Sequence, residues 1–326
     1  MDDRQLMFLD TASLYFRAFF GIPGTLRADN GTPINAVHGL LDMLTRLITQ
    51  YSPTGVVCAW DNDWRPGWRV DLIPSYKAHR LLPEPMPGAI VGAGGIGAVS
   101  GQQEITDADL VVQVPIIVAA LAAVGLSVQG HDGFEADDVL ASLVAAATRA
   151  DQRSLVVTGD RDLFQLVDEH CRVIYLGRGV AKHDVVDDAW LAGKYGIIGA
   201  QYADFATLRG DASDGLPGVS GIGEKTAEAL LDKHGDLAGI LAAASDPHSG
   251  MAARLRVALA SNIDYLARAG EVVRCVSELN VDVDVALDSV RVDEEACRRL
   301  AECWQLGGAI NRLLVAIGHP TLDLNA

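Results

Sequence analysis

Residues 154–160 read SLVVTGD, a short apolar run that ends in an acidic residue. The same arrangement occurs twice earlier, where residues 6–10 read LMFLD and residues 55–61 read GVVCAWD. Further short apolar runs lie at 126–128 and 173–176, and stretches with helical spacing separate the runs, near 34–50, 107–124, 135–149 and 162–169. Alternating strands and helices are typical of an α/β fold with a mostly parallel sheet flanked by helices.

The pattern changes after about residue 200, where only helical segments follow. The turn-rich stretch 210–223 lies at this junction. We therefore expect an α/β domain over residues 1–205 and a helical part over residues 206–326, without internal repeats.

The composition is that of a folded but acidic protein. In 326 residues there are 26 Lys and Arg against 43 Asp and Glu, a net charge of −17, and 49% of residues are hydrophobic. This balance excludes a protein that binds nucleic acid by bulk positive charge, but it does not exclude binding through a local basic patch. The five cysteines are scattered without a CxxC pair, no apolar run is long enough to span a bilayer, and the chain begins with two acids. We expect a soluble, cytoplasmic protein.

Residues 83–101 form a low-complexity stretch with three prolines followed by six glycines. It contains a formal GxGxxG at Gly92, Gly94 and Gly97. A dinucleotide-binding loop needs a strand before this motif and a helix directly after it. Here a proline cluster precedes it and a further glycine follows it, so a flexible linker is the favoured interpretation.

Acidic residues follow three of the predicted strands, namely Asp10, Asp61 and Asp160, with Asp162 two residues later. A single Asp after a strand is ordinarily a helix N-cap. However, the carboxyl ends of parallel strands share one edge of a sheet, where sites form. We therefore expect these acids to converge.

A second acidic group opens a predicted helix in EADDVLASL, with Glu135, Asp137 and Asp138 in four positions. Compensation of the helix dipole is the simpler explanation, but fewer acids would suffice for it. Glu135 and Asp138 share a helix face, and Asp211 and Asp214 repeat their spacing.

If these nine acids meet, they need cations or strongly raised pKa values. Oxygen ligands without His or Cys suit Mg²⁺ or Mn²⁺, and a pair of such ions about 4 Å apart can activate water against a phosphodiester. Calcium storage is the alternative, but no EF-hand spacing occurs. The candidate metal ligands are Asp10, Asp61, Glu135, Asp137, Asp138, Asp160, Asp162, Asp211 and Asp214.

Residues 215–231 read GLPGVSGIGEKTAEALL, a glycine-rich turn followed by an amphipathic helix. Such a turn exposes backbone N–H groups at a helix N-terminus, which bind phosphate without reading sequence. A packing corner between helices is the alternative, and the spacing is not that of a Walker A motif. The candidate contacts are Gly218, Gly221, Gly223, Lys225 and Thr226.

Residues 64–80 read WRPGWRVDLIPSYKAHR and form a locally basic patch with a charge of +3, from four Arg or Lys residues and Asp71. Basic groups between aromatic rings can hold phosphates while the rings stack on bases. A solvated helix is the alternative. The basic residues are Arg65, Arg69, Lys77 and Arg80, and the aromatic ones are Trp64, Trp68 and Tyr76.

These segments resemble the bacterial 5′-nuclease family, which includes flap endonucleases and the 5′-3′ exonuclease domain of bacterial DNA polymerase I. The shared strings are LDTASLYFRAFF, SYKAHR, EADDVLASL, TGDRDLFQL and GDASDGLPGVSGIGEKTAEALL. They occur in the family's order and cover roughly residues 5–235, so together they are far more specific than any one of them.

The resemblance implies a PIN-like nuclease domain, a helical arch at about 62–108 and a helix–three-turn–helix element at about 206–245. The nine acids would hold two or three Mg²⁺ or Mn²⁺ ions. Lys77 and Arg80 would contact phosphate as catalytic residues, Tyr76 would stack on the terminal base, and Arg69 would add a DNA contact. The glycine turn would hold duplex DNA, with K⁺ as a further expected ion.

The implied activity is that of a structure-specific 5′-nuclease of DNA replication and repair. Its substrates would be 5′ flaps, nicks or free 5′ ends, with RNA primer ends left open, and the protein would be monomeric without a membrane partner. Gly215 departs from the family pattern, because many members have asparagine there. The alternatives are a non-catalytic junction-binding protein, which should have lost acids, and a PIN-type ribonuclease, which is usually shorter and lacks the glycine turn.

Overall fold

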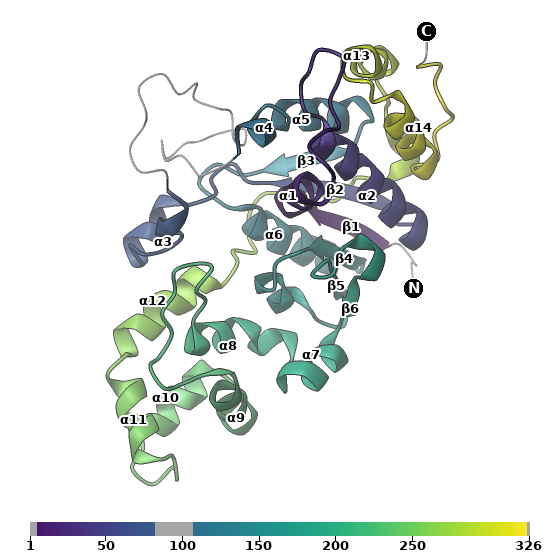
Figure 1. Cartoon of the computed structure of the whole chain (residues 1–326). Coiled ribbons are helices and arrows are strands. Elements are labelled where there is room, and N and C mark those ends of the chain that lie inside the picture. The colour runs from purple at the N-terminus through teal and green to yellow at the C-terminus, as the bar shows by residue number, and fades with distance from the viewer. Residues whose placement is uncertain (1–4, 82–106, 325–326) are drawn as a thin grey trace.

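The computed structural model describes residues 5–81 and 107–324. A six-stranded sheet lies at its centre, in the order β3-β2-β1-β4-β5-β6 (Figure 1). All neighbouring pairs are parallel except β5 and β6. The strands are β1 (Gln5–Asp10), β2 (Gly55–Trp60), β3 (Ser127–Gly130), β4 (Arg153–Thr158), β5 (Cys171–Tyr175) and β6 (Asp184–Val186). The predicted α/β class with a mostly parallel sheet is confirmed; the short strand β6 was not expected.

Helices cover both faces of the sheet, because successive strand residues point to opposite sides. Met7 and Leu9 face a core that includes helices α1 (Thr11–Gly21), α2 (Asn35–Tyr51) and α5 (Val114–Ala123). Leu6 and Phe8 face a second core, formed with α6 (Ala136–Arg149) and the helices that follow β6. The central strands are therefore buried on both sides.

Two predicted helices differ in detail from the structure. The stretch 107–124 divides into α4 (Ala108–Val111) and α5, and Pro115 lies in the first turn of α5, where proline is tolerated. The stretch 162–169 is a short 3₁₀ helix, η2 (Asp162–Leu166).

The predicted helical part over residues 206–326 does not form one body. Helices α7 to α12 extend from one side of the sheet, and residues 274–286 then lead back to it (Figure 1). Helices α13 and α14 join the core of α2 and α5, so the last part of the chain completes the α/β layer instead. The bounds are α7 (Asp188–Tyr195), α8 (Tyr202–Arg209), α9 (Glu224–His234), α10 (Leu237–Ser245), α11 (Ala253–Ala260), α12 (Ile263–Val273), α13 (Glu294–Trp304) and α14 (Gly307–Ala316).

The predicted arch over residues 62–108 is described only at its base. The base contains α3 (Gly67–Leu72) and the 3₁₀ turn η1 (Ala78–Arg80). The glycine-rich stretch 83–101, with its GxGxxG, lies outside the described residues. Within the described ranges, no helix combines the length and the apolarity needed to cross a bilayer.

Helix α2 takes its N-terminal cap from a residue far along the chain. Its own N-cap residue, Ile34, has no side chain that can accept a hydrogen bond. Instead, the buried Oε1 of Gln113 accepts the N–H groups of Ala36 and Val37, at 2.8 and 3.3 Å. The Gln113 amide also donates to Asn35 Oδ1 at 3.0 Å. One side chain thus satisfies two of the orphan donors of the helix and joins it to α5.

Gln113→Leu should lower the free energy of unfolding by about 2 to 4 kcal/mol, because two buried N–H groups lose their acceptor. Urea denaturation of the full chain measures this loss. Gln50→Leu, an exposed change on α2, the helix that Gln113 caps, should stay within about 0.5 kcal/mol of wild type. Equal stability of the two variants would contradict the capping role.

Candidate active site

Three predicted acids do meet at one edge of the sheet. Asp10 ends β1, which pairs with β2 on one side and with β4 on the other. Asp61 follows β2, and Asp160 comes two residues after the end of β4. The chain reverses its strand order between β1 and β4, and such switch points open a crevice at the carboxyl ends of the strands.

Asp10 is fixed within this edge by hydrogen bonds on both carboxylate oxygens. The Thr158 hydroxyl donates to Oδ2 at 2.7 Å, and the Ser13 N–H donates to Oδ1 at 3.1 Å. Burial, followed by repulsion from Asp61 and Asp160, raises the pKa of Asp10 to about 7 despite these bonds. Burial and the neighbouring acids therefore outweigh the two hydrogen bonds to this carboxylate.

Asp137 points toward the same edge from the first turn of α6. Burial raises its pKa well above the ordinary value, and repulsion from Asp160 and Asp10 adds to the effect. Burial also raises the pKa of Asp61, although the carboxylate accepts the Ala136 N–H at 2.7 Å. Helix α6 thus presents its N-terminus and one carboxylate to the strand ends.

Asp162 is the acid whose surroundings most plainly fit a cation. Its Oδ1 is buried and has no hydrogen-bond partner among the described residues. Burial raises its pKa well above the ordinary value, and Asp160, Asp214 and Asp211 add repulsion. A buried carboxylate oxygen without a donor is costly, and a bound cation would remove that cost.

Asp211 and Asp214 lie at the same edge but are engaged by protein donors. Asp211 Oδ1 accepts the N–H of Ser213 at 2.8 Å and also bonds the Ser213 hydroxyl. Asp214 lies 3.3 Å from Arg80 Nη2, and burial raises its pKa. Both acids are nevertheless close enough to raise the pKa of Asp162.

Glu135 differs from the other acids because cations surround it. It pairs with the Lys77 ammonium, accepts the Tyr76 hydroxyl at 2.7 Å, and lies 3.2 Å from Arg69 Nη1. Burial alone would raise its pKa, but Lys77 and Arg69 outweigh burial and leave the pKa of Glu135 lowered. Burial likewise would lower the pKa of Lys77, yet Glu135 raises it well above its usual value.

Lys77 is held in an uncommon backbone conformation, with φ = 48°. The left-handed region costs a non-glycine residue about 1 kcal/mol, so the surroundings must enforce it. The Lys77 N–H donates to the Asp214 carbonyl at 3.0 Å, and the Ser75 hydroxyl donates to the Gly215 carbonyl at 2.9 Å. These bonds dock the arch base on the 210–216 loop and turn Lys77 toward the carboxylates.

The same contact explains the glycine at 215. Gly215 has φ = 72°, and a Cβ there would overlap the Ser75 carbonyl oxygen. Asparagine tolerates the left-handed region but carries this Cβ. In this chain glycine allows the arch base to approach the loop closely.

Four of the predicted roles need correction. Asp138 is fully buried and forms a bidentate pair with Arg69, so its oxygens face protein donors instead of the shared edge. Arg69 is only 2% exposed and does not reach a DNA surface. Tyr76 is buried at 3% exposure with its hydroxyl on Glu135, which leaves no open ring face for a base. The Gly218 N–H already donates to the Tyr265 hydroxyl at 2.9 Å.

The rest of the glycine turn remains open. Gly221 has φ = 84°, and Gly223 is the N-cap of α9 with no capping side chain. Gly221, Gly223 and Lys225 are exposed, while Thr226 is half-buried. The Arg254 guanidinium on α11 lies beside Gly221, and no motif in the sequence predicts this contact.

The carboxylates fit divalent ions in chemistry and position, but they do not surround one as they stand. In the parts of the chain that are described, no three His, Cys, Asp or Glu side chains form a group tight enough to hold an ion. Asp160 and Asp10 both raise the pKa of Asp137, and Asp160 also raises that of Asp10, so these carboxylates are near one another although they do not enclose an ion. Side-chain rotation toward an ion would be required.

Two supporting residues were missed by sequence reasoning. Thr158 donates to Asp10 and accepts the Asp160 N–H at 2.8 Å, so it links two strand ends. Its place two residues before Asp160 in TGD was the available signal. Gln165 donates to the carbonyl oxygen of Asp162 at 2.9 Å and has no such signal.

Known proteins resemble this chain over most of its length. Family models for the 5′-3′ exonuclease N-terminal resolvase-like domain and for its C-terminal SAM fold match residues 5–196 and 197–296. A 5′-3′ exonuclease of Streptomyces coelicolor is 48% identical over 95% of this chain and 99% of its own length. One of Mycobacterium tuberculosis is 43% identical over 96% and 97%.

Similarity also extends to solved structures. The bacteriophage T5 flap endonuclease, in a complex with DNA and metal ions, matches 97% of this chain and 100% of its own, with a TM-score of 0.62 at 14% identity. At that identity the match supports the fold. Sequence motifs, family models and full-length relatives agree: the chain belongs to the 5′-3′ exonuclease family.

Proposed function

We propose that this protein is a structure-specific 5′-nuclease, a flap endonuclease and 5′-3′ exonuclease that hydrolyses DNA phosphodiesters with divalent metal ions in replication and repair. The observation that carries the proposal is the group of buried, mutually repelling carboxylates at the switch point, with Lys77 among them. The full-length relatives named 5′-3′ exonuclease support the same activity.

Two or three Mg²⁺ or Mn²⁺ ions would be held by the acids that face the sheet edge. When bound, such ions supply an activated water and neutralise charge on the leaving oxygen. Asp138 is not in this set because Arg69 occupies it. The proposed ligands are Asp10, Asp61, Glu135, Asp137, Asp160, Asp162, Asp211 and Asp214.

Lys77 and Arg80 are the proposed phosphate-binding residues. The Lys77 ammonium stays charged and lies within the carboxylate group, so it can pass from Glu135 to a phosphate oxygen. Arg80 is partly exposed beside Asp214 and can bind the next phosphate. A fixed cation near the scissile bond stabilises the negative charge that develops during hydrolysis.

The open part of the glycine turn is proposed to hold the duplex. Gly221 and Gly223 let the backbone approach a phosphate, α9 directs its N-terminus there, and Lys225 and Thr226 lie in its first turn. A K⁺ ion at this turn is part of the proposal. Expected substrates are 5′ flaps, nicks and free 5′ ends, including RNA primer ends, bound by a cytoplasmic monomer.

Asp137→Asn and Asp160→Asn should each reduce cleavage more than about 100-fold, beyond the usual effect of losing an outer partner of a metal site. Binding of the substrate junction should persist, because the turn and the basic residues are unchanged. The assay uses a 5′-labelled flap, a nicked duplex and a single strand, each with Mg²⁺, Mn²⁺ or chelator, and anisotropy measures binding.

Asp288→Asn is the control, because this carboxylate is exposed and lies on the 3₁₀ turn at 287–289, away from the acids. It should cleave like wild type. Cleavage that persists in chelator, or wild-type rates in both active-site variants, would contradict the metal-dependent proposal.

Without metal, the protein should lose stability as pH rises. The folded pKa of Asp10 is about 7 against an ordinary 3.8, so the folded state binds this proton more tightly than the unfolded state does. The resulting stabilisation is complete below the ordinary value and is lost as pH rises toward 7. In chelator, Tm should therefore fall between pH about 4 and about 7, and Mg²⁺ should raise Tm more at the higher pH.

Asp10→Asn removes the titrating carboxyl group, so its Tm should fall less steeply with rising pH. The Tm of Asp288→Asn should follow that of wild type. Thermal denaturation with and without Mg²⁺ makes the comparison. A Tm that rises over this interval in chelator, with no gain from Mg²⁺, would argue against the buried acid cluster.

A further inference from the structure

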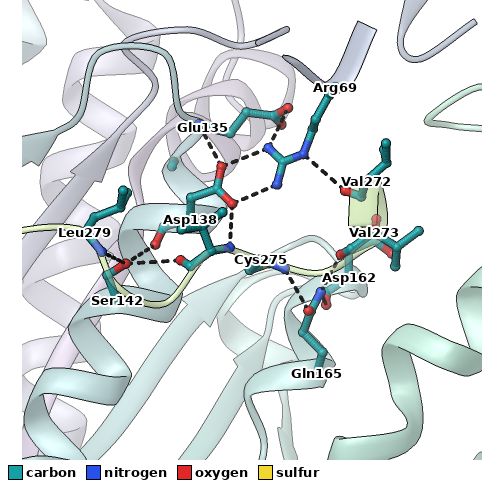
Figure 2. Close-up of polar contacts among 12 residues, drawn as sticks. Arg69, Glu135, Asp138, Ser142, Asp162, Gln165, Val272, Val273, Cys275 and Leu279 are labelled. Atoms are coloured by element: carbon teal, nitrogen blue, oxygen red, sulfur yellow. Dashed lines mark hydrogen bonds and ion pairs between the residues drawn. The ribbon is translucent and has the colours of Figure 1, made fainter. Parts of the chain in front are cut away.

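Figure 2 shows the buried pair of Arg69 and Asp138. The chemistry proposed above does not use this pair. The two side chains are 2% and 0% exposed. Arg69 Nη1 lies 2.8 Å from Asp138 Oδ2, and Nη2 lies 2.7 Å from Oδ1, a bidentate arrangement. Such a pair combines strength with a fixed geometry.

Backbone donors complete the coordination of the Asp138 carboxylate. Oδ1 also accepts the Val276 N–H at 2.8 Å, and Oδ2 also accepts the Glu135 N–H at 3.2 Å. Each oxygen then has two donors, which fills its hydrogen-bonding capacity. Asp138 therefore has no lone pair left for a metal ion.

Arg69 uses its remaining donors on two other segments. Its Nε donates to the Val272 carbonyl at 3.1 Å, and its Nη1 lies 3.2 Å from Glu135 Oε1. Its guanidinium also lies 4.5 Å from the centre of the Trp68 ring. The arch base, the start of α6 and the end of α12 thus meet at one cation.

Residues 272–279, here called the strap, join this pair to the acids. The Ser142 hydroxyl of α6 donates to the Val276 carbonyl at 3.1 Å, and Gln165 accepts the Cys275 N–H at 3.0 Å (Figure 2). Gln165 also donates to the Asp162 carbonyl at 2.9 Å. The strap is therefore anchored both to the helix that carries Asp137 and to the turn that carries Asp162.

The strap also leads to the DNA-binding side. The strap begins in the last turn of α12, which ends at Val273. The same helix carries Tyr265, whose hydroxyl accepts the Gly218 N–H at 2.9 Å. One continuous set of contacts therefore runs from the glycine turn through α12 to Arg69. It ends at Glu135 and Lys77.

We infer that Arg69 and Asp138 are positioning residues that act as one unit, and that they set the geometry of Glu135 and Lys77 relative to the helices that hold the duplex. This inference rests on the proposed function. Neither side chain contacts substrate or metal. The unit works by clamping α3, the first turn of α6 and the strap onto one another.

The test compares Arg69→Lys, Asp138→Asn and the double variant in the full chain. Lysine at position 69 keeps the positive charge but cannot form the bidentate pair. Asparagine at position 138 places its NH₂ group, a donor, against the N–H donors that bind the Asp138 carboxylate. Each single change should lower the single-turnover rate at saturating Mg²⁺ by about 10- to 100-fold, with junction binding retained. The double variant should be no slower than the slower single, because the two residues form one unit.

Gln113→Leu is the matched control for stability, since it loses buried hydrogen bonds to Asn35, Ala36 and Val37, none of which is a candidate ligand. Measured well below its Tm, it should keep the wild-type rate. Arg298→Lys, on an exposed pair with Glu294, should change neither rate nor Tm. If a single variant does not fold, Arg69→Met with Asp138→Leu removes both charges and keeps an apolar interior; it should be folded and slow.

Several results would overturn the inference. A normal rate in Arg69→Lys together with a slow Asp138→Asn that needs more Mg²⁺ would make Asp138 a metal ligand. If the rate losses of the two single variants multiply in the double variant, the residues do not act as one unit. A wild-type cleavage rate in the Arg69→Met, Asp138→Leu variant would show that the pair does not position the active site. If wild type itself cleaves no substrate, the proposed function fails first, and the two failures are thus distinguishable.

Discussion

The arrangement of charged residues in this protein depends on electrostatic repulsion among carboxylates at one edge of the sheet. The parallel order of β1, β2 and β4 carries Asp10, Asp61 and Asp160 to the same place, and α6 adds Asp137 from its first turn. Burial raises the pKa of Asp10 and Asp137, and their neighbours raise it further. Arg69, Lys77 and Arg80 are each paired with particular carboxylates here.

The available cations divide between two tasks. Arg69 is buried with Asp138 and closes the interior side, so it is fixed in place. Lys77 pairs with Glu135 from a left-handed backbone, beside the acids that still lack a partner cation. We regard the first pair as structural support and the second as the working contact. This division also fits the net charge of −17, since phosphate binding then depends on a few local groups.

The sequence was sufficient where chemistry follows from chain topology. Strand-end acids had to meet, because parallel strands share one carboxyl edge, and this predicted the place of Asp10, Asp61 and Asp160. It was insufficient where a residue's role depends on distant partners. Arg69 stands in a basic, aromatic stretch that suggests a surface, yet Val272 and Asp138 bury it. Likewise, local pattern did not show that α13 and α14 return to α2.

The central claim is that divalent ions bind among the carboxylates at this edge while Asp138 stays on Arg69. Crystals of the full chain grown with Mn²⁺ would test it, because anomalous scattering locates the ions directly. We expect Mn²⁺ peaks bounded by Asp137, Asp160 and Asp162, with the Arg69–Asp138 pair intact. An edge without Mn²⁺, or an ion coordinated by Asp138, would contradict the account.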